Sequence, residues 1–294
     1  MQFVTLDDYS NLPVTEPDWL VPQLIPKEGI ILLIGPPKAG KSFLALQIAR
    51  DAAQARPVLG RVPPEPVRSL YLQLDASPRM WRIVTRTLKD SGEDLSGPVY
   101  LVHPDHWTRL NILLSPDQQR LRELIALTNA QLVIVDVFRE IHTLDENDST
   151  AMKIVGDHLC SAVQGAALLL IHHSRKIPPD VPDPDPMTYG RGSSYMVGKA
   201  DSVWFLYKDK LRIIPRFDEG LTYRAVREES GFWQFPELSA YQTKQAGVLA
   251  LCAELPELTH RQLAAIAKTR LGVSMASYYR LLAGVSCVHT RDAQ

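Results

Sequence analysis

The stretch from residue 30 to residue 49, IILLIGPPKAGKSFLALQIA, constrains the fold of this chain more than any other. Its apolar run at 30–34 is typical of a buried strand, and the apolar spacing that begins at Phe43 favours a helix. Between them, residues 35–42 (GPPKAGKS) fit the pattern G-x-x-x-x-G-K-[ST] without a mismatch. A strand, a glycine loop and a helix in this order predict a phosphate-binding loop, because backbone N–H groups and the helix dipole at a helix start favour an anion.

The residue types within this loop predict a nucleoside triphosphate as the ligand. Lys41 supplies a mobile positive charge for the β- and γ-phosphates, and the Ser42 hydroxyl is placed to ligate Mg²⁺. The alternative is a chance glycine-rich turn, which the complete pattern in this context disfavours. We therefore expect the chain to bind ATP and Mg²⁺ and to hydrolyse the ATP. The predicted nucleotide-binding residues are Gly35, Pro36, Pro37, Lys38, Ala39, Gly40, Lys41, Ser42 and Phe43.

Composition narrows the class of protein. At 294 residues the chain has room for one large domain and a small one, and its 45% hydrophobic and 22% charged content is typical of a soluble globular protein. No apolar run has the length of about 18 residues that a membrane span needs. The N-terminus lacks the pattern of a secretory signal, and the three cysteines are sparse, so we expect a cytoplasmic protein without a zinc site. The net charge of −1 disfavours wholesale electrostatic coating of nucleic acid and leaves room for local patches.

Apolar runs alternate with helical patterns over the first two thirds of the chain. Strands are expected at 30–34, 69–74, 99–102, 131–135 and 167–171. Helices are expected from residue 41 and at 78–89, 116–127 and 149–163. Because the strands are fully apolar, the pattern predicts an α/β fold with a mostly parallel sheet covered by helices on both faces.

The pattern changes after residue 174. Residues 174–192 are polar and rich in proline, which predicts a long loop without helix or central strand. Four short runs follow, at 202–206, 211–214, 222–226 and 232–235, and their turn residues predict antiparallel hairpins at one edge of the sheet. We expect three parts: a lead at 1–28 that packs on the core through an anchor at residues 19–24, a core at 29–240, and a helical module at 241–294.

Polar residues end three of the predicted strands, where ligands bind in open parallel sheets. Asp136 is expected to hold Mg²⁺, the alternative being an acid that caps a turn. Asp75 is a candidate general base for the attacking water, or else a solvated strand end or the cap of the next helix. His172 and His173 end the third strand, where a histidine can contact the γ-phosphate. Zinc binding and a purely structural role are the alternatives for the histidines, although no Cys or spaced His completes a zinc ligand set.

Several segments together resemble a known family. They are VDVFREIH at 135–142 followed by DEND at 145–148, IHHSRK at 171–176, and GRGSS at 190–194 followed by ADSV at 200–203. In this order they resemble RecA-like ATPases related to the RepA replicative helicase of plasmids, and WLV at 19–21 fits as well. The similarity covers roughly residues 15–235 and is more specific than the phosphate-binding loop alone.

The resemblance implies a RecA-type core that works as a homo-oligomeric ring, commonly a hexamer, with ATP at the subunit interfaces. By matching position, Lys41 and Ser42 bind phosphate and Mg²⁺, and Asp136 is the Walker B acid. His173 is then the γ-phosphate sensor. Single-stranded DNA is the implied partner of the core.

The same resemblance makes Arg191 the best candidate for an arginine finger that enters the site of a neighbouring subunit. A finger must sit on a reachable loop, and Arg191 follows the long proline loop. A solvated loop arginine is the alternative, and Arg175 or Lys176 are the other candidates for the finger.

Two departures from the family pattern keep a second function open. The family usually has Glu at the position of Asp75, and the shorter carboxylate predicts slow turnover. The loops that would contact DNA carry acids, which repel phosphates: Asp145, Glu146, Asp148, Asp180, Asp183 and Asp185. The alternative is an ATP-switched, DNA-binding regulatory protein that does not translocate. A small-molecule kinase is a third reading, for which no acceptor pocket is evident.

Residues 259–284 (THRQLAAIAKTRLGVSMASYYRLLAG) have the pattern of two short helices around a glycine turn. Thr259 and Ser274 are the expected N-caps, and Tyr278 is expected to face inward. The pattern is similar to a helix-turn-helix that binds duplex DNA. The alternative is a helical hairpin that only packs on the core or on a neighbouring chain. The residues expected to face DNA are Ser277, Tyr279 and Arg280, with Arg261, Lys268 and Arg270 at phosphates.

Overall fold

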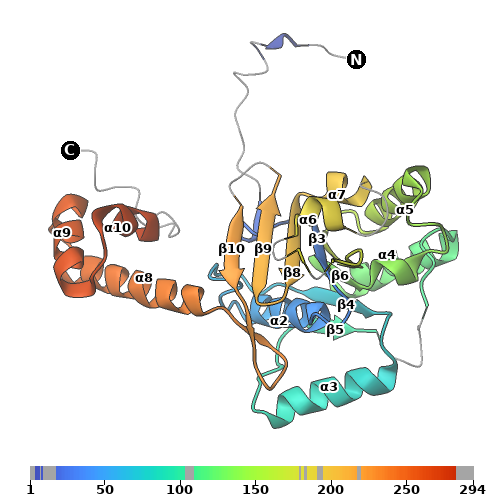
Figure 1. Cartoon of the computed structure of the whole chain (residues 1–294), viewed down its shortest axis with the longest axis horizontal. Coiled ribbons are helices and arrows are strands. Elements are labelled where there is room, and N and C mark those ends of the chain that lie inside the picture. The colour runs from blue at the N-terminus through green and yellow to red at the C-terminus, as the bar shows by residue number, and fades with distance from the viewer. Residues whose placement is uncertain are drawn as a thin grey trace.

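A computed structural model describes residues 4–6, 8, 18–102, 109–178, 180–181, 184–190, 195–216 and 220–282. These residues form an eight-stranded sheet in the order β10-β9-β8-β3-β7-β6-β4-β5 (Figure 1). Strands β8, β3, β7, β6, β4 and β5 run parallel, and β9 and β10 are antiparallel to their neighbours. The bounds are β3 (Ile30–Gly35), β4 (Ser69–Gln73), β5 (Val99–Leu101), β6 (Leu132–Asp136), β7 (Ala167–His173), β8 (Ser202–Tyr207), β9 (Lys210–Pro215) and β10 (Leu221–Arg224).

Helices cover both faces of this sheet, as its apolar strands predicted. One face packs against α2 (Lys41–Ala53) and α3 (Pro78–Asp90). The other packs against α4 (Ser115–Thr128), α5 (Ser149–Ala162), α7 (Tyr195–Lys199) and the 3₁₀ turn η1 (Phe138–Ile141). Side chains alternate along a strand, so Ile31 and Leu33 of β3 face α2 while Leu32 and Ile34 face the other layer. The α/β fold with a mostly parallel sheet is confirmed.

A short hairpin precedes the sheet and serves as the predicted anchor. Strands β1 (Trp19–Val21) and β2 (Ile25–Pro26) pair antiparallel. Leu20, Val21 and Leu24 are buried in the core layer beside α2, and Trp19 is half-buried. The apolar residues of the segment 19–25 therefore pack on the core.

In the second half of the core, one expectation was wrong and another was confirmed. A short helix, α6 (Pro186–Tyr189), interrupts the proline-rich stretch, because proline is tolerated in a first helical turn and Asp185 caps this turn by accepting from Met187 N at 3.1 Å. The run at 202–206 forms the expected antiparallel hairpin with the next run, as β8 pairs with β9, and on its other side β8 is parallel to β3.

The last two strand segments also differ from the prediction. The main sheet ends at β10, and β11 (Val226–Arg227) pairs instead with β12 (Trp233–Gln234) in a separate two-stranded ribbon. The run at 222–226 is thus divided between two sheets. Short apolar runs predict strands, but they do not specify partners.

Three helices follow the ribbon: α8 (Pro236–Glu254), α9 (His260–Leu271) and α10 (Met275–Leu282). They share a small core of their own that includes Val248, Leu263 and Tyr278. Thr259 and Gln262 form a capping box at the start of α9, and Gly272 ends this helix with φ 64°. The expected boundary at 240/241 falls inside α8.

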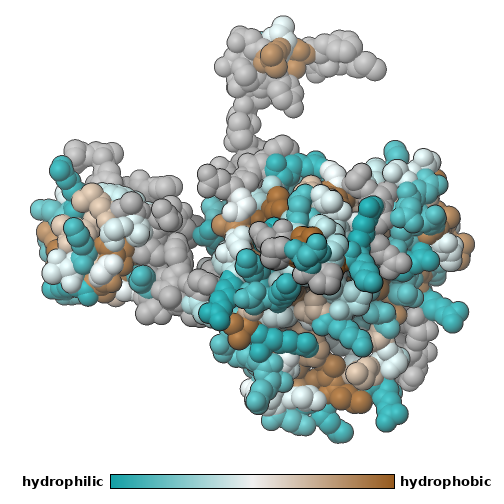
Figure 2. Space-filling view, viewed as in Figure 1, coloured by the Kyte–Doolittle hydropathy of each residue, from teal (hydrophilic) through white to brown (hydrophobic). Residues whose placement is uncertain are grey.

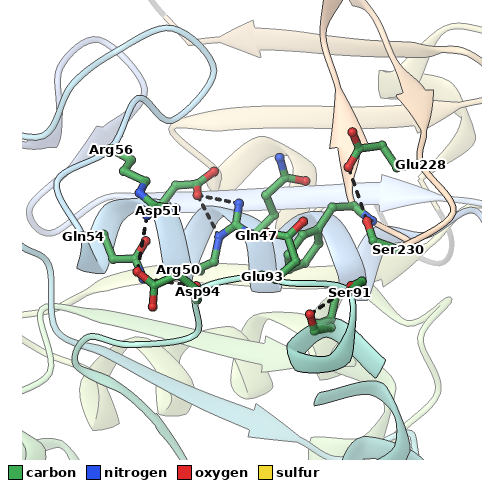
Figure 3. Close-up of polar contacts among 12 residues, drawn as sticks. Gln47, Arg50, Asp51, Gln54, Arg56, Ser91, Glu93, Asp94, Glu228 and Ser230 are labelled. Carbon is green, nitrogen blue, oxygen red and sulfur yellow. Dashed lines mark hydrogen bonds and ion pairs between the residues drawn. The ribbon is translucent and has the colours of Figure 1, made fainter. Parts of the chain in front are cut away.

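Ion pairs fix the far end of α2, as Figure 3 shows. Arg50 bonds to Asp51 at 2.7 Å and also to Glu93 in the segment after α3, and its guanidinium lies 4.4 Å from the Phe232 ring centroid. Since Arg50 is largely buried, these bonds compensate for the loss of water around its charge. Among the described residues, no helix is both long enough and apolar enough to cross a bilayer.

The burial of β3 gives a test of the core. Leu33 is 0% exposed, so Leu33→Ala is expected to lower the free energy of unfolding by about 2–5 kcal/mol through lost burial and a cavity. The matched control is Leu127→Ala on α4, where the side chain is 80% exposed, with an expected change of about 0.5 kcal/mol or less. Urea denaturation measures both, and equal effects would contradict the assignment of the core.

The capping box gives a local test of α9. Thr259→Ala removes the acceptor of the Gln262 N–H and should destabilise the helix start by about 1 kcal/mol. Thr269→Ala, in the last turns of the same helix, should have no such effect because Thr269 caps nothing. Hydrogen exchange of the α9 amides measures the difference, which should be absent if Thr259 does not cap.

Candidate functional site

The glycine loop joins β3 to α2 at the carboxyl edge of the sheet, as predicted. Gly40 has φ 89°, a conformation that favours glycine, and a Cβ there would lie 2.7 Å from Trp233 Cζ2. A Cβ on Gly35 would lie 2.4 Å from the Leu206 carbonyl oxygen. Inside the loop, Ala39 N donates to Pro36 O at 3.2 Å. Both glycines of the pattern are thus required by close packing.

Lys41 lies at the inner end of this loop. Its Nζ donates to Gly35 O at 2.9 Å and to Pro36 O at 2.8 Å, and it lies 3.3 Å from His173 Nδ1. The residue is only 5% exposed. The ammonium is therefore held by oriented acceptors beside the end of β7, at the place where the loop would receive a phosphate.

Asp136, at the end of β6, contacts the start of α2 through Tyr71. Tyr71 lies on β4, and its hydroxyl donates to Asp136 Oδ2 at 2.8 Å and lies 3.2 Å from Ser42 O. The carboxylate is buried, and it also has a side-chain hydrogen bond with Ser42. The Asp136–Val137 peptide bond is cis. Sequence reasoning did not identify Tyr71, although a buried tyrosine needs a partner for its hydroxyl.

Burial shifts the pKa values of both central charges toward neutrality. Desolvation raises the pKa of Asp136 to about 6, against the opposing effects of Tyr71 and Lys41. Desolvation also lowers the pKa of Lys41 to about 8, opposed by the charges of Asp136 and Asp75. Burial and Asp136 raise the pKa of Tyr71 well above its ordinary value, so Tyr71 stays a neutral donor. Between about pH 6 and pH 8, Asp136 is ionised and Lys41 is protonated.

Several of the predicted site residues meet around one cavity of about 320 Å³. Lys41, Ser42, Asp136 and His173 line it together with Asp75, which is exposed at the end of β4. Parallel strands bring these side chains together from four separate stretches of the chain. Perturbed pKa values in a cavity of this kind are typical of a functional site.

His172 is on the opposite face of β7 and has different neighbours. Its ring lies 5.4 Å from the Phe138 ring, and its Nδ1 is 3.9 Å from Glu146 Oε1. Only His173 of the two candidate histidines therefore lines the cavity. Within the part of the chain that the structure describes, no three His, Cys, Asp or Glu side chains are grouped in a way that could hold a metal ion.

Most acids of the two loops have structural partners. Glu146 is buried near His172, so its expected position facing DNA was wrong. Asp148 caps α5 by accepting from Thr150 N at 2.8 Å, and Asp145 accepts from Asn147 N at 2.9 Å. Asp185 caps α6, Asp180 is exposed, and Asp183 lies outside the described residues. Of the described loop acids only Glu146 is withdrawn from the surface, and the others keep their negative charge there.

Arg191, the finger candidate, lies outside the described residues, but the segment that leads to it is described. Gly190 forms an antiparallel bridge with Ser174, and Arg175 N donates to Tyr189 O at 2.8 Å. This holds the end of the proline-rich stretch alongside the end of β7. Arg175 and Lys176 are both exposed there.

The β11–β12 ribbon contributes contacts that sequence reasoning missed. Trp233 Nε1 donates to Gly40 O at 3.2 Å. The Trp233 backbone also exchanges two hydrogen bonds with the Gln47 side chain, at 2.7 and 2.9 Å. Arg227 of the same ribbon lines the cavity. A tryptophan in a short strand predicts burial, whereas its partner in the loop follows only from tertiary structure.

The oxygen donors present fit a hard divalent cation. Ser42 offers a hydroxyl and Asp136 a carboxylate, which are the ligand types that Mg²⁺ takes together with water and substrate phosphates. Burial makes the charge of Asp136 costly even beside Lys41, and a bound divalent cation would lower that cost further. We therefore assign Ser42 and Asp136 as the residues that would hold Mg²⁺.

The two pKa values predict the pH dependence of nucleotide binding. Below about pH 6 Asp136 is protonated and loses its attraction for the cation, and above about pH 8 Lys41 loses its charge. The affinity for Mg²⁺·ATP is thus expected to be highest between these values and to fall on both sides. Fluorescence titration with a labelled ATP from pH 5 to 9.5 measures it.

The control for this profile is Lys41→Arg, which stays charged over the whole range and should remove the alkaline decline. Protonation of the nucleotide itself affects both proteins equally. An alkaline decline that persists in the Lys41→Arg protein would show that another group causes it.

Comparison with solved structures supports the fold. The ATPase domain of G40P superposes with a TM-score of 0.53 at 12% identity, covering 70% of this chain and 84% of that chain. A KaiC-like protein from Pyrococcus horikoshii OT3 gives a TM-score of 0.47 at 13% identity, covering 73% of this chain and 93% of that chain. Many chains share this architecture, so the fold alone does not select a function.

Sequence comparison gives the family. No curated protein matches the chain. The profile of the AAA_25 family, described as AAA domain, matches residues 1–178, which include β3, the glycine loop, Asp136 and β7. With its parallel sheet, its complete phosphate-binding loop and this match, the chain belongs to the AAA_25 family and has the fold of a RecA-like P-loop ATPase.

Proposed function

We propose that the chain is an ATP-hydrolysing, DNA-associated motor of the RecA/RepA-like type. It works as a homo-oligomeric ring, and a hexamer is the ring size proposed. The observation that carries this proposal is the meeting of Lys41, Ser42, Asp75, Asp136 and His173 around one cavity at the carboxyl edge of the sheet. Membership of an AAA domain family and the likeness to the ATPase domain of G40P support ATP as the substrate.

In this proposal the glycine loop binds the triphosphate. The backbone N–H groups at the start of α2 and the Lys41 ammonium attract the β- and γ-phosphates. The Lys41 ammonium has three N–H donors, and two of them are used by Gly35 O and Pro36 O, which leaves the third for a phosphate oxygen. When bound at Ser42 and Asp136, Mg²⁺ would neutralise phosphate charge. Tyr71 keeps the Asp136 carboxylate oriented for that role.

Asp75 is the proposed general base of hydrolysis. The water oxygen forms a bond to the γ-phosphorus while the bond from the γ-phosphorus to the β–γ bridging oxygen breaks, and Asp75 accepts the water proton. The products are ADP and inorganic phosphate. His173 contacts Lys41 and stands at the γ-phosphate end, so it is the proposed sensor of hydrolysis.

The finger is proposed to be Arg191 of a neighbouring copy. Support comes from its position after Gly190, which is anchored at the end of β7 near the site edge. A heterologous contact of this kind, repeated around a rotation axis, closes a ring. Arg175 and Lys176 remain the alternatives for the same role.

DNA is the proposed partner, single-stranded at the core and duplex at a helix-turn-helix in the C-terminal module, residues 241–294. Support comes from the exposed Arg261, Lys268 and Tyr279 on α9 and α10. Arg270 bonds to Glu254 at 3.1 Å, which makes it a weaker candidate for a phosphate contact.

The second candidate is an ATP-switched DNA-binding regulator that does not translocate. The short Asp75 side chain favours it, because slow hydrolysis suits a switch. Strand displacement on a forked duplex separates the two candidates, since a switch binds DNA and unwinds nothing.

The proposal as a whole predicts that DNA and assembly affect the ATPase together. Single-stranded DNA should raise the ATPase rate severalfold, and the mass in the same buffer should be that of an oligomer with ATP. The control is Lys41→Ala, which should abolish hydrolysis in both conditions. The proposal would be contradicted if the protein stayed monomeric with ATP and if DNA left its ATPase rate unchanged.

Mixing two inactive variants tests the finger. Lys41→Ala lacks the phosphate contact and Arg191→Ala lacks the finger, so neither alone should hydrolyse ATP. In a one-to-one mixture about a quarter of the interfaces would pair an intact loop with an intact finger, and about that share of wild-type activity should return. No recovery above the separate variants would remove the support for a finger that acts in trans.

A further inference from the structure

The nucleotide cavity extends beyond the residues that a triphosphate needs. Past the loop it is lined by Phe43 and Leu46 of α2 and by Met80, Trp81 and Val84 of α3. These walls are apolar and offer nothing to a phosphate. Figure 2 shows a hydrophobic area beside α3 on a face that is otherwise mostly hydrophilic, and Met80 is 52% exposed. An apolar extension beside a polar end is the shape expected of a site for an amphipathic ligand such as a nucleotide.

One cation, Arg227, stands over this extension. Its guanidinium carbon lies 4.9 Å from the centroid of the Phe43 ring, and its Nε donates to Gly231 O at 3.3 Å. Arg227 lines the cavity and also the adjoining hollow that includes Ile83 and Thr87. The residue is exposed, so one face of the guanidinium rests on Phe43 while the other is open to a ligand.

The close approach of this ribbon to Phe43 depends on glycine. Gly231 has φ 94°, and a Cβ there would lie 2.5 Å from Phe43 Cε1. The ribbon is also tied to the loop itself, through Trp233 Nε1 on Gly40 O and through Gln47. Arg227 and the phosphate-binding loop therefore belong to one packed unit, and the distance between them is fixed by that packing.

We propose that Arg227 forms the nucleobase subsite: the base stacks on the outer face of its guanidinium, and Phe43 supports the inner face. A planar, delocalised guanidinium stacks well on aromatic rings, whereas a lysine ammonium does not. Stacking tolerates different bases because every base has a π-face, so ATP and GTP should bind with similar affinity. This inference rests on the proposed binding of a nucleoside triphosphate.

The test compares ATP with inorganic tripolyphosphate, both with Mg²⁺, by calorimetry on the full chain. The wild type should bind ATP more tightly than tripolyphosphate. Arg227→Ala should weaken ATP binding about tenfold, which is the scale of one base–side-chain stack, and should leave tripolyphosphate binding within about twofold. Arg227→Lys keeps the charge and should still lose most of the ATP preference.

Two controls separate stacking from folding and from general charge. Unchanged tripolyphosphate binding by the Arg227→Ala protein shows that its loop is folded. Arg86→Ala removes an exposed arginine of α3 that does not line the cavity, and it should change neither affinity.

Three results would overturn the inference. Equal affinity of the wild type for both ligands, or an Arg227→Ala protein with unchanged ATP affinity, would exclude the subsite and leave the proposed function standing. Equal losses for both ligands would make Arg227 a phosphate contact instead. A wild type that binds neither ligand would contradict the proposed function itself.

Discussion

The carbonyl oxygen of Gly35 accepts hydrogen bonds from two directions, and the site depends on both. Ser174 N donates to it at 3.0 Å and continues the pairing of β3 with β7, in which Gly35 stands opposite His173. Lys41 Nζ donates to it at 2.9 Å from the start of α2. One backbone atom thus sets the register of the sheet edge and the position of the ammonium. The missing side chain of Gly35 is what allows β8 to approach at the same point.

The electrostatics of the cavity explain why such positioning is needed. Burial makes ionised Asp136 and protonated Lys41 both costly to the fold. The cost of Asp136 diminishes as pH falls from about 6 toward the ordinary carboxyl pKa of 3.8, and that of Lys41 diminishes as pH rises from about 8 toward 10.5. At neutral pH both charges are retained, held by Tyr71 and by the loop carbonyls. A fold that carries this cost is understandable if a phosphate and a divalent cation use the two charges.

Much of the fold could be predicted from local pattern. The β3–loop–α2 unit and the strands that end in Asp136 and His173 matched their expected positions closely, because each combines an apolar run with a boundary signal. Strand partners could not be predicted in the same way. The pairing of β8 with both β3 and β9, and the division of residues 222–226 between two sheets, are set by packing between distant segments.

The residues of the site also fall into two groups: those that local sequence patterns predict and those that only contacts between distant segments place. Lys41, Ser42 and Asp136 stand in patterns that predict their chemistry, and parallel strands then bring them together. Tyr71, Trp233 and Arg227 act through partners far away in sequence, so no local pattern marks them. Glu146 was misplaced for a related reason, since its loop turns inward and buries the carboxylate near His172. Long-range contacts, rather than residue types, decided these positions.

The central claim is that the cavity at the end of β3 binds a magnesium–nucleotide complex through Lys41, Ser42 and Asp136. Calorimetric titration of the full chain with ATP, with Mg²⁺ and again with the metal chelated, tests this most directly. We expect one saturable site per chain, weaker by about tenfold or more without Mg²⁺, and no saturable binding in the Lys41→Ala protein. The claim would be contradicted if the unmodified protein gave no saturable heat of ATP binding, or if the Lys41→Ala protein bound ATP with the same affinity.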